Sequence, residues 1–268
     1  MTIKKHLSLK PLIDGFKQAF DGYKDGRRQK SVDYSILDTA LSTLACMFYK
    51  SGNLVRFQKN LKKRFYKNNL ETQFGVTGTP EDNQIRSIIS TIPSDTFKPI
   101  FKKYLNRLQR SKHLNKYQFQ DKYLVAIDAT QYHTSETIKC SECLKQEKRN
   151  GKIEYSHKAL QPIICHPDQK QILPMMPEPI KNTDGEKKQD CEINAAKRMI
   201  PKLRSQHPRM PFIWLADSIY ATGPFIKTIT SANEDFIFRI KKGDHKSLYK
   251  HIEEAEYPSH KTVMGNTT

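Results

Sequence analysis

Two short apolar stretches, each ending in an aspartate, constrain this chain more than any other feature of its sequence. The first is YLVAID at residues 123–128, and the second is FIWLAD at residues 212–217. Each has the length and the β-branched or aromatic content of a buried strand. Two such strands can deliver Asp128 and Asp217 side by side at one edge of a sheet. A carboxylate pair of this kind could hold divalent metal ions for phosphoryl chemistry.

An aspartate that follows a strand is also a common turn former or helix cap, and this alternative stays open for either residue alone. Thr222 precedes a Gly-Pro pair and is a better cap than Asp217 for the helix that follows. Two matching strand-to-aspartate endings in one basic chain are more informative than a single one, and they favour a metal-binding pair.

The charge of the chain indicates the kind of partner. Lys and Arg total 46 against 28 Asp and Glu, which gives a net charge of +18 over 268 residues. A charge of this size predicts an anionic partner, and nucleic acid is the usual one. The sequence contains neither an apolar run long enough to span a bilayer nor the apolar core of a signal peptide. We therefore expect an intracellular, cytoplasmic protein.

Helical periodicity dominates residues 1–118. Apolar residues recur at helical spacing in residues 7–23, 36–48, 54–65, 85–89 and 97–108. We expect Thr79 to cap one helix with Pro80 at its first position, and Pro99 to lie in the first turn of another. Two of the helices carry basic polar faces, formed by Arg56, Lys59, Lys62, Lys63 and Arg64, and by Lys102, Lys103, Arg107, Arg110 and Lys112. The region is predicted to be all-helical, and is either a DNA-binding module or a bundle with a solvated basic face.

From residue 119 the pattern alternates between strands and helices. We expect strands at residues 123–128, 152–156, 160–166, 171–174, 212–217 and 235–240, and helices at 190–203, 223–229 and 247–256. Asn150-Gly151 predicts a hairpin turn, Pro201 should end or kink its helix, and residues 182–188 read as a polar loop. The sequence thus predicts an α/β domain over residues 119–268.

The cysteines form a second group of candidate ligands. Five cysteines, with one Cys140-x2-Cys143 pair, do not suggest a disulfide framework. With His157 downstream, this spacing predicts a zinc site in an insertion at residues 133–166, beside basic residues that could touch DNA. The candidates for a fourth ligand are His133, Cys165 and His166, and the alternative is a flexible loop with reduced thiols. Cys46 and Cys191 are expected to lie in the core.

Several segments carry a family resemblance, in the expected order along the chain. They are residues 33–58, 79–86 (TPEDNQIR), 127–132 (IDATQY), 188–198 (KQDCEINAAKR), 216–220 (ADSIY) and 238–245 (FRIKKGDH). In these segments the chain resembles bacterial insertion-sequence transposases of the DDE type, whose catalytic domain has a ribonuclease H-like fold.

The resemblance implies a mixed sheet with flanking helices, on which Asp128 lies on the first strand and Asp217 on the fourth. It implies that the two residues bind two Mg²⁺ or Mn²⁺ ions. The implied activity is DNA strand cleavage and strand transfer during transposition of an insertion sequence. The implied partner is double-stranded DNA, at the transposon ends and the target, with a dimer as the active form and a bacterial, nucleoid-associated location.

The sequence departs from this family at the third carboxylate. That residue is a Glu on a later helix, within a Tyr-x2-Arg-x3-Glu-x6-Lys pattern that is absent here. Glu253, Glu254 and Glu256 come too early and lack the flanking Tyr and Arg, and Glu192 is not assigned to the role. We therefore expect a catalytic domain that is incomplete at its C-terminus. The alternatives are a catalytically inactive DNA-binding remnant or regulator of a transposon, and a stand-alone metal-dependent nuclease.

A set of basic residues near the predicted site could flank DNA, although each of them is equally consistent with ordinary solvated charge. The set consists of Lys187, Lys188, Lys197, Arg198, Lys241 and Lys242.

Overall fold

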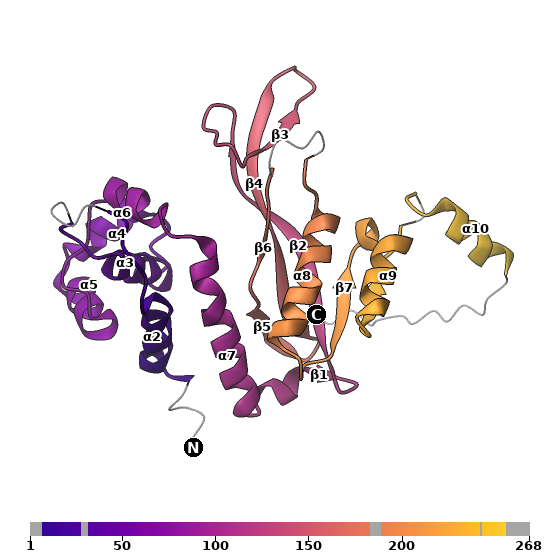
Figure 1. Cartoon of the computed structure of the whole chain (residues 1–268), viewed down its shortest axis with the longest axis horizontal. Coiled ribbons are helices and arrows are strands. Elements are labelled where there is room, and N and C mark those ends of the chain that lie inside the picture. Colours follow the sequence, from indigo (N-terminus) through magenta and orange to yellow (C-terminus); the bar gives the residue numbers. More distant parts are fainter. Residues whose placement is uncertain (1–6, 28–31, 183–188, 242, 256–268) are drawn as a thin grey trace, which may run out of the picture. The chain divides into compact units, whose positions relative to one another are not determined.

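The computed structural model describes residues 7–27, 32–182, 189–241 and 243–255 (Figure 1). The chain divides into two compact units, residues 1–116 and residues 117–268. The first unit is helical, and the second is built on one mixed sheet. Lys187, Lys188, Lys242 and Glu256 lie outside the described residues, as does most of the predicted polar loop at 182–188.

The helical unit confirms the expected all-helical region before the sheet. Its α-helices are α2 (Leu9–Lys17), α3 (Ile36–Phe48), α4 (Leu54–Leu61), α5 (Arg64–Asn69), α6 (Asp82–Ile89) and α7 (Lys98–Arg110). The hydroxyl of Ser35 caps α3 by accepting from the backbone N–H of Asp38 at 2.9 Å. The side chain of Asn53 caps α4 in the same way, accepting from Arg56 N–H at 2.8 Å. Buried residues of α2, α3, α4, α6 and α7 form one core that includes Leu41, Phe57 and Phe74, whereas α5 has no buried residue.

Two local predictions in the helical unit were wrong. The helix expected over residues 54–65 ends at Leu61, and α5 begins after the extended residue Lys63. Helix α6 begins at Asp82, so Pro80 precedes the helix instead of occupying its first position. The reason is that Pro80 is buried, and its carbonyl accepts a hydrogen bond from the side chain of Gln58. Pro99 lies in the first turn of α7, as predicted.

The second unit contains an eight-stranded mixed sheet (Figure 1). Its strands are β1 (Gln118–Phe119), β2 (Lys122–Ser135), β3 (Leu144–Glu147), β4 (Ile153–His166), β5 (Gln169–Pro174), β6 (Glu178–Ile180), β7 (Phe212–Ala216) and β8 (Asp235–Phe238). The main path through the sheet is β3-β4-β2-β7-β8. Strand β2 is antiparallel to β4 and parallel to β7, which is parallel to β8. This confirms the predicted α/β class with a mixed sheet after a helical region, and the arrangement is consistent with a ribonuclease H-like fold.

Three helices accompany the sheet: α8 (Glu192–Gln206), α9 (Gly223–Ser231) and α10 (Lys246–Glu254). Helix α8 contacts β4 and β6, α9 contacts β8, and α8 and α9 contact each other. The side chains of Leu160, Trp214 and Phe225 are fully buried in this unit. Helix α8 continues five residues beyond Pro201, so this proline, which was predicted to end or kink its helix, does not end it. Its apolar face stays buried through Leu203, and this packing outweighs the hydrogen bond that proline cannot make.

The two strands predicted at residues 152–156 and 160–166 are one continuous strand, β4. The polar pair His157-Lys158 interrupts the apolar pattern, but both residues still pair with β2. Strands β3 and β6 were not predicted, because neither has an apolar alternation long enough to identify it. The predicted turn at Asn150-Gly151 joins β3 to β4, and Gly151 adopts the left-handed conformation with φ of 75°. In the described part of the chain, no helix is both long and apolar enough to cross a membrane.

The single tryptophan, Trp214, is buried in β7 and reports on the sheet unit. We predict that Leu160→Ala lowers the free energy of unfolding of this unit by about 2–5 kcal/mol, because it leaves a cavity in the core. The measurement is the urea midpoint followed by Trp214 fluorescence. The matched change Leu41→Ala in the helical core should lower the midpoint of helix loss and leave the Trp214 midpoint unchanged. Equal shifts of the Trp214 midpoint by both variants would show that the two units unfold together.

Candidate functional site

The register of β2 against β7 places Asp128 and Asp217 at the same level of the sheet. These strands are parallel, and Ala126 pairs with Leu215. Asp128 lies two residues beyond Ala126 along β2, and Asp217 lies two residues beyond Leu215 along the direction of β7. Asp217 directly follows the last residue of β7, as predicted, whereas Asp128 lies inside β2, which continues to Ser135. The prediction that Asp128 ends its strand was wrong, because β4 continues to pair with β2 beyond the end of β7.

Both aspartate side chains are exposed, and each makes a local hydrogen bond. Asp128 Oδ1 accepts from the backbone N–H of Ala129 at 2.8 Å, and Asp217 Oδ1 accepts from that of Ile219 at 3.1 Å. Asp217 therefore caps the short 3-10 helix Ser218–Tyr220. Thr222 occupies the cap position of α9 but makes no side-chain capping bond. Asp217 thus caps this short helix and not α9, and the cap uses one carboxylate oxygen.

A third carboxylate, Glu192, faces this pair from the first turn of α8. Burial is the largest cause of a raised pKa for Glu192, and the negative charges of Asp128 and Asp217 raise that pKa further. The positive charge of Lys158 and a hydrogen bond from Tyr220 act in the opposite direction. The Tyr220 hydroxyl lies 3.5 Å from Glu192 Oε2. The charges of both aspartates thus act on this half-buried side chain.

Tyr220 lies within the same group of charges. Its side chain is buried, and burial, followed by the charges of Glu192, Asp128 and Asp217, raises the pKa of its hydroxyl. The hydroxyl therefore stays protonated and can act as a hydrogen-bond donor to the acidic cluster.

The sequence does contain a signal that could have identified Glu192. Only a short connection joins the end of α8 at Gln206 to the start of β7 at Phe212. A helix of 15 residues spans about 22 Å, so α8 must run back along the sheet, antiparallel to β7, to make that connection. Its first turn then lies near the end of β7, where Asp217 is placed. An acidic residue in that first turn is therefore directed towards the aspartate pair.

An ion-pair network fixes the start of α8. The Arg198 guanidinium lies 2.7 Å from Asp190 Oδ2 and 3.2 Å from Glu178 Oε1, and Lys202 Nζ lies 2.8 Å from Glu178 Oε1. Burial alone would raise the pKa of Asp190, but the hydrogen bonds and charge of Arg198 outweigh it and hold that pKa below its ordinary value. Glu178 belongs to β6, so the network joins this strand to the turn that presents Glu192.

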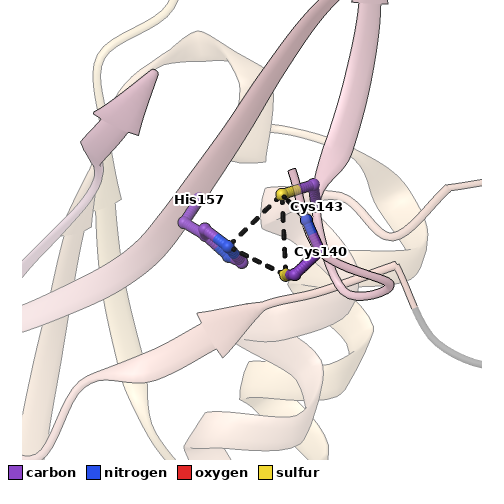
Figure 2. A group of neighbouring side chains, drawn as sticks. All are labelled: Cys140, Cys143 and His157. Carbon is purple, nitrogen blue, oxygen red and sulfur yellow. Dashed lines mark hydrogen bonds between the residues drawn. The ribbon is translucent and has the colours of Figure 1, made fainter. Parts of the chain in front are cut away.

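A second cluster of possible ligands lies near the β3–β4 hairpin (Figure 2). Cys140 and Cys143 lie in the loop before β3, and His157 belongs to β4. The two Sγ atoms are 3.6 Å apart, and His157 Nε2 lies 3.3 Å from Cys140 Sγ and 3.4 Å from Cys143 Sγ. This group could hold a metal ion. Burial raises the pKa of the Cys143 thiol.

Among the residues that the structure describes, this is the one group of three or more His, Cys, Asp or Glu whose ligand atoms all lie within 4.8 Å of one another. The carboxylate oxygens of the acidic cluster are therefore spaced more widely than the ligand atoms of the thiol and imidazole group. The acidic cluster consists of Asp128, Asp217 and Glu192, and the other group of Cys140, Cys143 and His157.

The structure separates the candidates for a fourth ligand. His133 pairs with His157 across β2 and β4, and the two rings lie 5.8 Å apart. Cys165 instead pairs with Leu124 at the other end of β4, eight residues or about 26 Å along the strand from His157. His166 follows it and accepts a hydrogen bond from Asp168 N–H at 3.2 Å. Cys165 and His166 are thus too far away to complete the cluster.

The two remaining cysteines differ in their environment. Cys46 is buried in the helical core, as predicted. Cys191 is exposed at the cap position of α8, so its predicted place in the core was wrong. The buried face of α8 begins at Ala195, one turn later.

Comparison with known proteins gives a limited result. No protein-family model and no curated protein matches the chain. Among solved structures, the chain is similar to a piggyBac transposase synaptic complex with hairpin DNA, with a TM-score of 0.34 and 11% sequence identity. The match covers 88% of this chain and 49% of that one, so this chain spans about half the length of the transposase chain.

We predict that Asp190→Asn lowers the free energy of unfolding by about 1–3 kcal/mol at pH 7, because it removes the charged partner of Arg198. The pKa of Asp190 in the folded protein lies below its ordinary value of 3.8, so its contribution is present above that value and is lost as the pH falls through the folded pKa. The difference from wild type should stay constant between pH 7 and pH 5 and shrink below about pH 4.

Urea unfolding followed by Trp214 fluorescence measures this difference. The control is Asp168→Asn in the exposed turn after β4, which should change stability by less than about 0.5 kcal/mol. A penalty for Asp190→Asn that persisted unchanged in acid would contradict the ion-pair explanation.

Proposed function

We propose that this chain acts on double-stranded DNA, through metal-dependent strand cleavage and strand transfer of the kind that moves an insertion sequence. One observation carries the proposal. The parallel register of β2 and β7 brings Asp128 and Asp217 to one level of the sheet, and the charge of each acts on Glu192. This arrangement supports the pair of catalytic carboxylates that the family resemblance implies.

The chemistry of the three side chains fits a hard divalent cation. Carboxylate oxygens are the ligands that Mg²⁺ prefers, and Mn²⁺ accepts the same set. The raised pKa of Glu192 reflects, after burial, the repulsion from Asp128 and Asp217, and Lys158 offsets that repulsion. We propose that Asp128, Asp217 and Glu192 hold Mg²⁺ or Mn²⁺, which when bound would activate a water or 3′-hydroxyl nucleophile and stabilise the leaving oxygen at phosphorus.

In this proposal the side chains of the chain have separate roles. The two aspartates supply the exposed carboxylates at the sheet edge, where a phosphate group can approach them. Glu192 takes the place of the family's third carboxylate, which the sequence lacks in its usual pattern. The Tyr220 hydroxyl donates to Glu192 Oε2 and so restricts the orientation of that carboxylate. Lys158, on β4, supplies a positive charge close enough to influence Glu192 and to attract a DNA phosphate.

We further propose that the basic face of α4 and the start of α5 contacts the DNA backbone. The residues on this face are all exposed: Arg56, Lys59, Lys62, Lys63 and Arg64. The basic face of α7 is less available, because Arg107 donates to the carbonyl of Pro11 at 2.8 Å and Lys103 donates to the side chain of Gln18. Exposed Lys and Arg that bind phosphates provide affinity without sequence preference.

A second candidate function is DNA binding without cleavage, as a remnant or regulator of a transposon. One observation favours it: within the described ranges the three carboxylates do not come together as closely as the Cys140, Cys143 and His157 group does. The two candidates agree on DNA as the partner and differ only in whether the acidic cluster is active.

The prediction that separates them is nicking of supercoiled plasmid DNA in the presence of Mn²⁺. We expect the wild-type protein to nick, and Asp128→Asn and Asp217→Asn each to lower the rate more than about 100-fold, beyond the 10–100-fold loss that outer-shell changes cause at metal sites. Glu192→Gln should cause a loss of the same order if it is the third carboxylate. The matched control Asp168→Asn should nick at the wild-type rate.

Plasmid binding measured without metal should be nearly unchanged in all of these variants. A wild-type protein that binds DNA but does not nick it would support the non-catalytic candidate. Nicking that survives Asp128→Asn would refute the assignment of the aspartate pair.

A second prediction concerns DNA affinity. The double change Lys59→Gln with Lys62→Gln should weaken DNA binding. It should also make the slope of the logarithm of the DNA association constant against the logarithm of the salt concentration shallower, by about 0.9 for each phosphate that is no longer neutralised. The matched double change is Lys148→Gln with Lys152→Gln, which removes the same charge from side chains that already pair with Glu136. Fluorescence anisotropy at several salt concentrations measures both. Equal effects of the two double variants would show that net charge, and not the α4 face, determines binding.

A further inference from the structure

We propose that Cys140, Cys143 and His157 bind one Zn²⁺ ion, which fastens the loop before β3 to strand β4. This site is separate from the acidic cluster and does not depend on the activity proposed for it. It uses different side chains and a different kind of ligand.

The distances between the three ligand atoms match those that zinc imposes. With Zn–S of about 2.3 Å and Zn–N of about 2.0–2.1 Å, a tetrahedral ion holds two sulfurs about 3.8 Å apart and each sulfur about 3.5 Å from the nitrogen. The observed separations are 3.6 Å between the two sulfurs, and 3.3 Å and 3.4 Å from sulfur to nitrogen. All three agree with the tetrahedral values to within about 0.2 Å. The three atoms therefore already form one face of a zinc tetrahedron (Figure 2).

The backbone around the cysteines explains why both sulfurs point to the same place. The N–H of Cys143 donates to the carbonyl of Cys140 at 3.3 Å, which closes a tight turn. The N–H of Cys140 donates to the sulfur of Cys143 at 3.2 Å. An amide donor to sulfur favours the thiolate, which is the form that binds metal. The imidazole of His157 is held by stacking against Tyr132, with ring centroids 5.9 Å apart and planes within 14°.

The ligand set selects the metal. Two thiolates and one imidazole suit Zn²⁺, whereas Mg²⁺ and Mn²⁺ prefer oxygen ligands. A disulfide is not the explanation of this pair, because both cysteines are free and their sulfurs are 3.6 Å apart, well beyond a bond of about 2.05 Å. Among the described residues, these three supply the ligand atoms that lie close enough together to share one ion.

The loop that carries the cysteines and the strand β3 that follows it are bound to the two ends of the connection from β6 to α8. Glu142 accepts from Lys181 Nζ at 2.9 Å, and its carbonyl accepts from the N–H of Asn182 at 3.2 Å. Lys145 and Gln189 exchange two hydrogen bonds, of 2.5 Å and 2.8 Å. A metal that joins this loop to His157 on β4 therefore also restrains Gln189, directly before the ion-paired Asp190. The inferred role of the ion is to organise the entry to α8.

The test measures metal directly and does not require DNA cleavage. The full chain is purified under reducing conditions without chelator, and zinc per chain is determined by mass spectrometry. Replacement with Co²⁺ is then followed by the charge-transfer absorption of cobalt thiolates and the visible bands of tetrahedral Co²⁺. We expect one zinc per chain in the wild type, and a loss of zinc affinity of more than about 100-fold in Cys143→Ser and in His157→Gln.

Cys165→Ser and Cys191→Ser are the matched controls, and both should retain zinc. Trp214 emission and circular dichroism show whether each variant is folded. A wild-type protein that holds much less than one zinc per chain, or that gives no cobalt–thiolate absorption, would overturn the proposal. So would a Cys165→Ser variant that loses as much zinc as Cys143→Ser.

Hydrogen exchange tests the structural role of the ion in the wild-type chain. Removal of zinc with a chelator should increase amide exchange in residues 140–147 and at residues 181, 182 and 189, and should leave exchange in α3 unchanged. Exchange that rose equally in α3 and in the loop, or that did not rise in the loop, would refute the role assigned to the ion.

Discussion

The parallel pairing of β2 with β7 is the interaction on which the acidic cluster depends. Its register fixes which residue of one strand lies beside which residue of the other, and a shift by one residue would turn each side chain to the opposite face. With Ala126 beside Leu215, Asp128 and Asp217 meet at the level where β7 stops. The buried side chains of Val125 and Trp214, which pair with each other in this register, hold it in place. The position of the carboxylates is thus a consequence of apolar packing.

Charge compensation separates the structural acids of the sheet unit from the candidate functional ones. Glu178 and Asp190 are nearly buried, and both are paired with Arg198, which is the arrangement that buried acids require. Glu192 lies two residues beyond Asp190, yet its surroundings include two further negative charges as well as the cation Lys158. A protein gains no stability from gathering three acids in this way. A half-buried acid with a raised pKa beside two further carboxylates is common at functional sites, and this contrast is the physical basis of the proposed assignment.

The sequence predicted the fold class, and its local patterns and short spacings singled out residues that the structure brings together: Asp128 with Asp217, and Cys140 and Cys143 with His157. The role of these residues as metal ligands stays a prediction. The sequence did not predict that β2 runs on past Asp128, since the length of a strand depends on how far its partner β4 extends. It also treated Glu192 as unassigned, because its position follows from the direction of α8 and not from its neighbours in the chain. Cys191 was misplaced for a related reason: hydrophobic periodicity identifies the face of a helix but not the residue at which burial begins.

The two proposed metal sites take residues from neighbouring strands, Asp128 from β2 and His157 from β4, and solve different physical problems. Beyond the end of β7, β2 has one strand partner among the described residues, β4, and their register shifts between Gln131 and His133. In the same stretch β4 also pairs with β6 and with β3, so the sheet continues here as a narrower extension. His157 lies in this part of β4, opposite His133 and about 16 Å along β2 from Asp128. A zinc ion held there would stabilise this extension of the sheet, while thiolate ligands keep that ion from competing for the oxygen ligands of the acidic cluster.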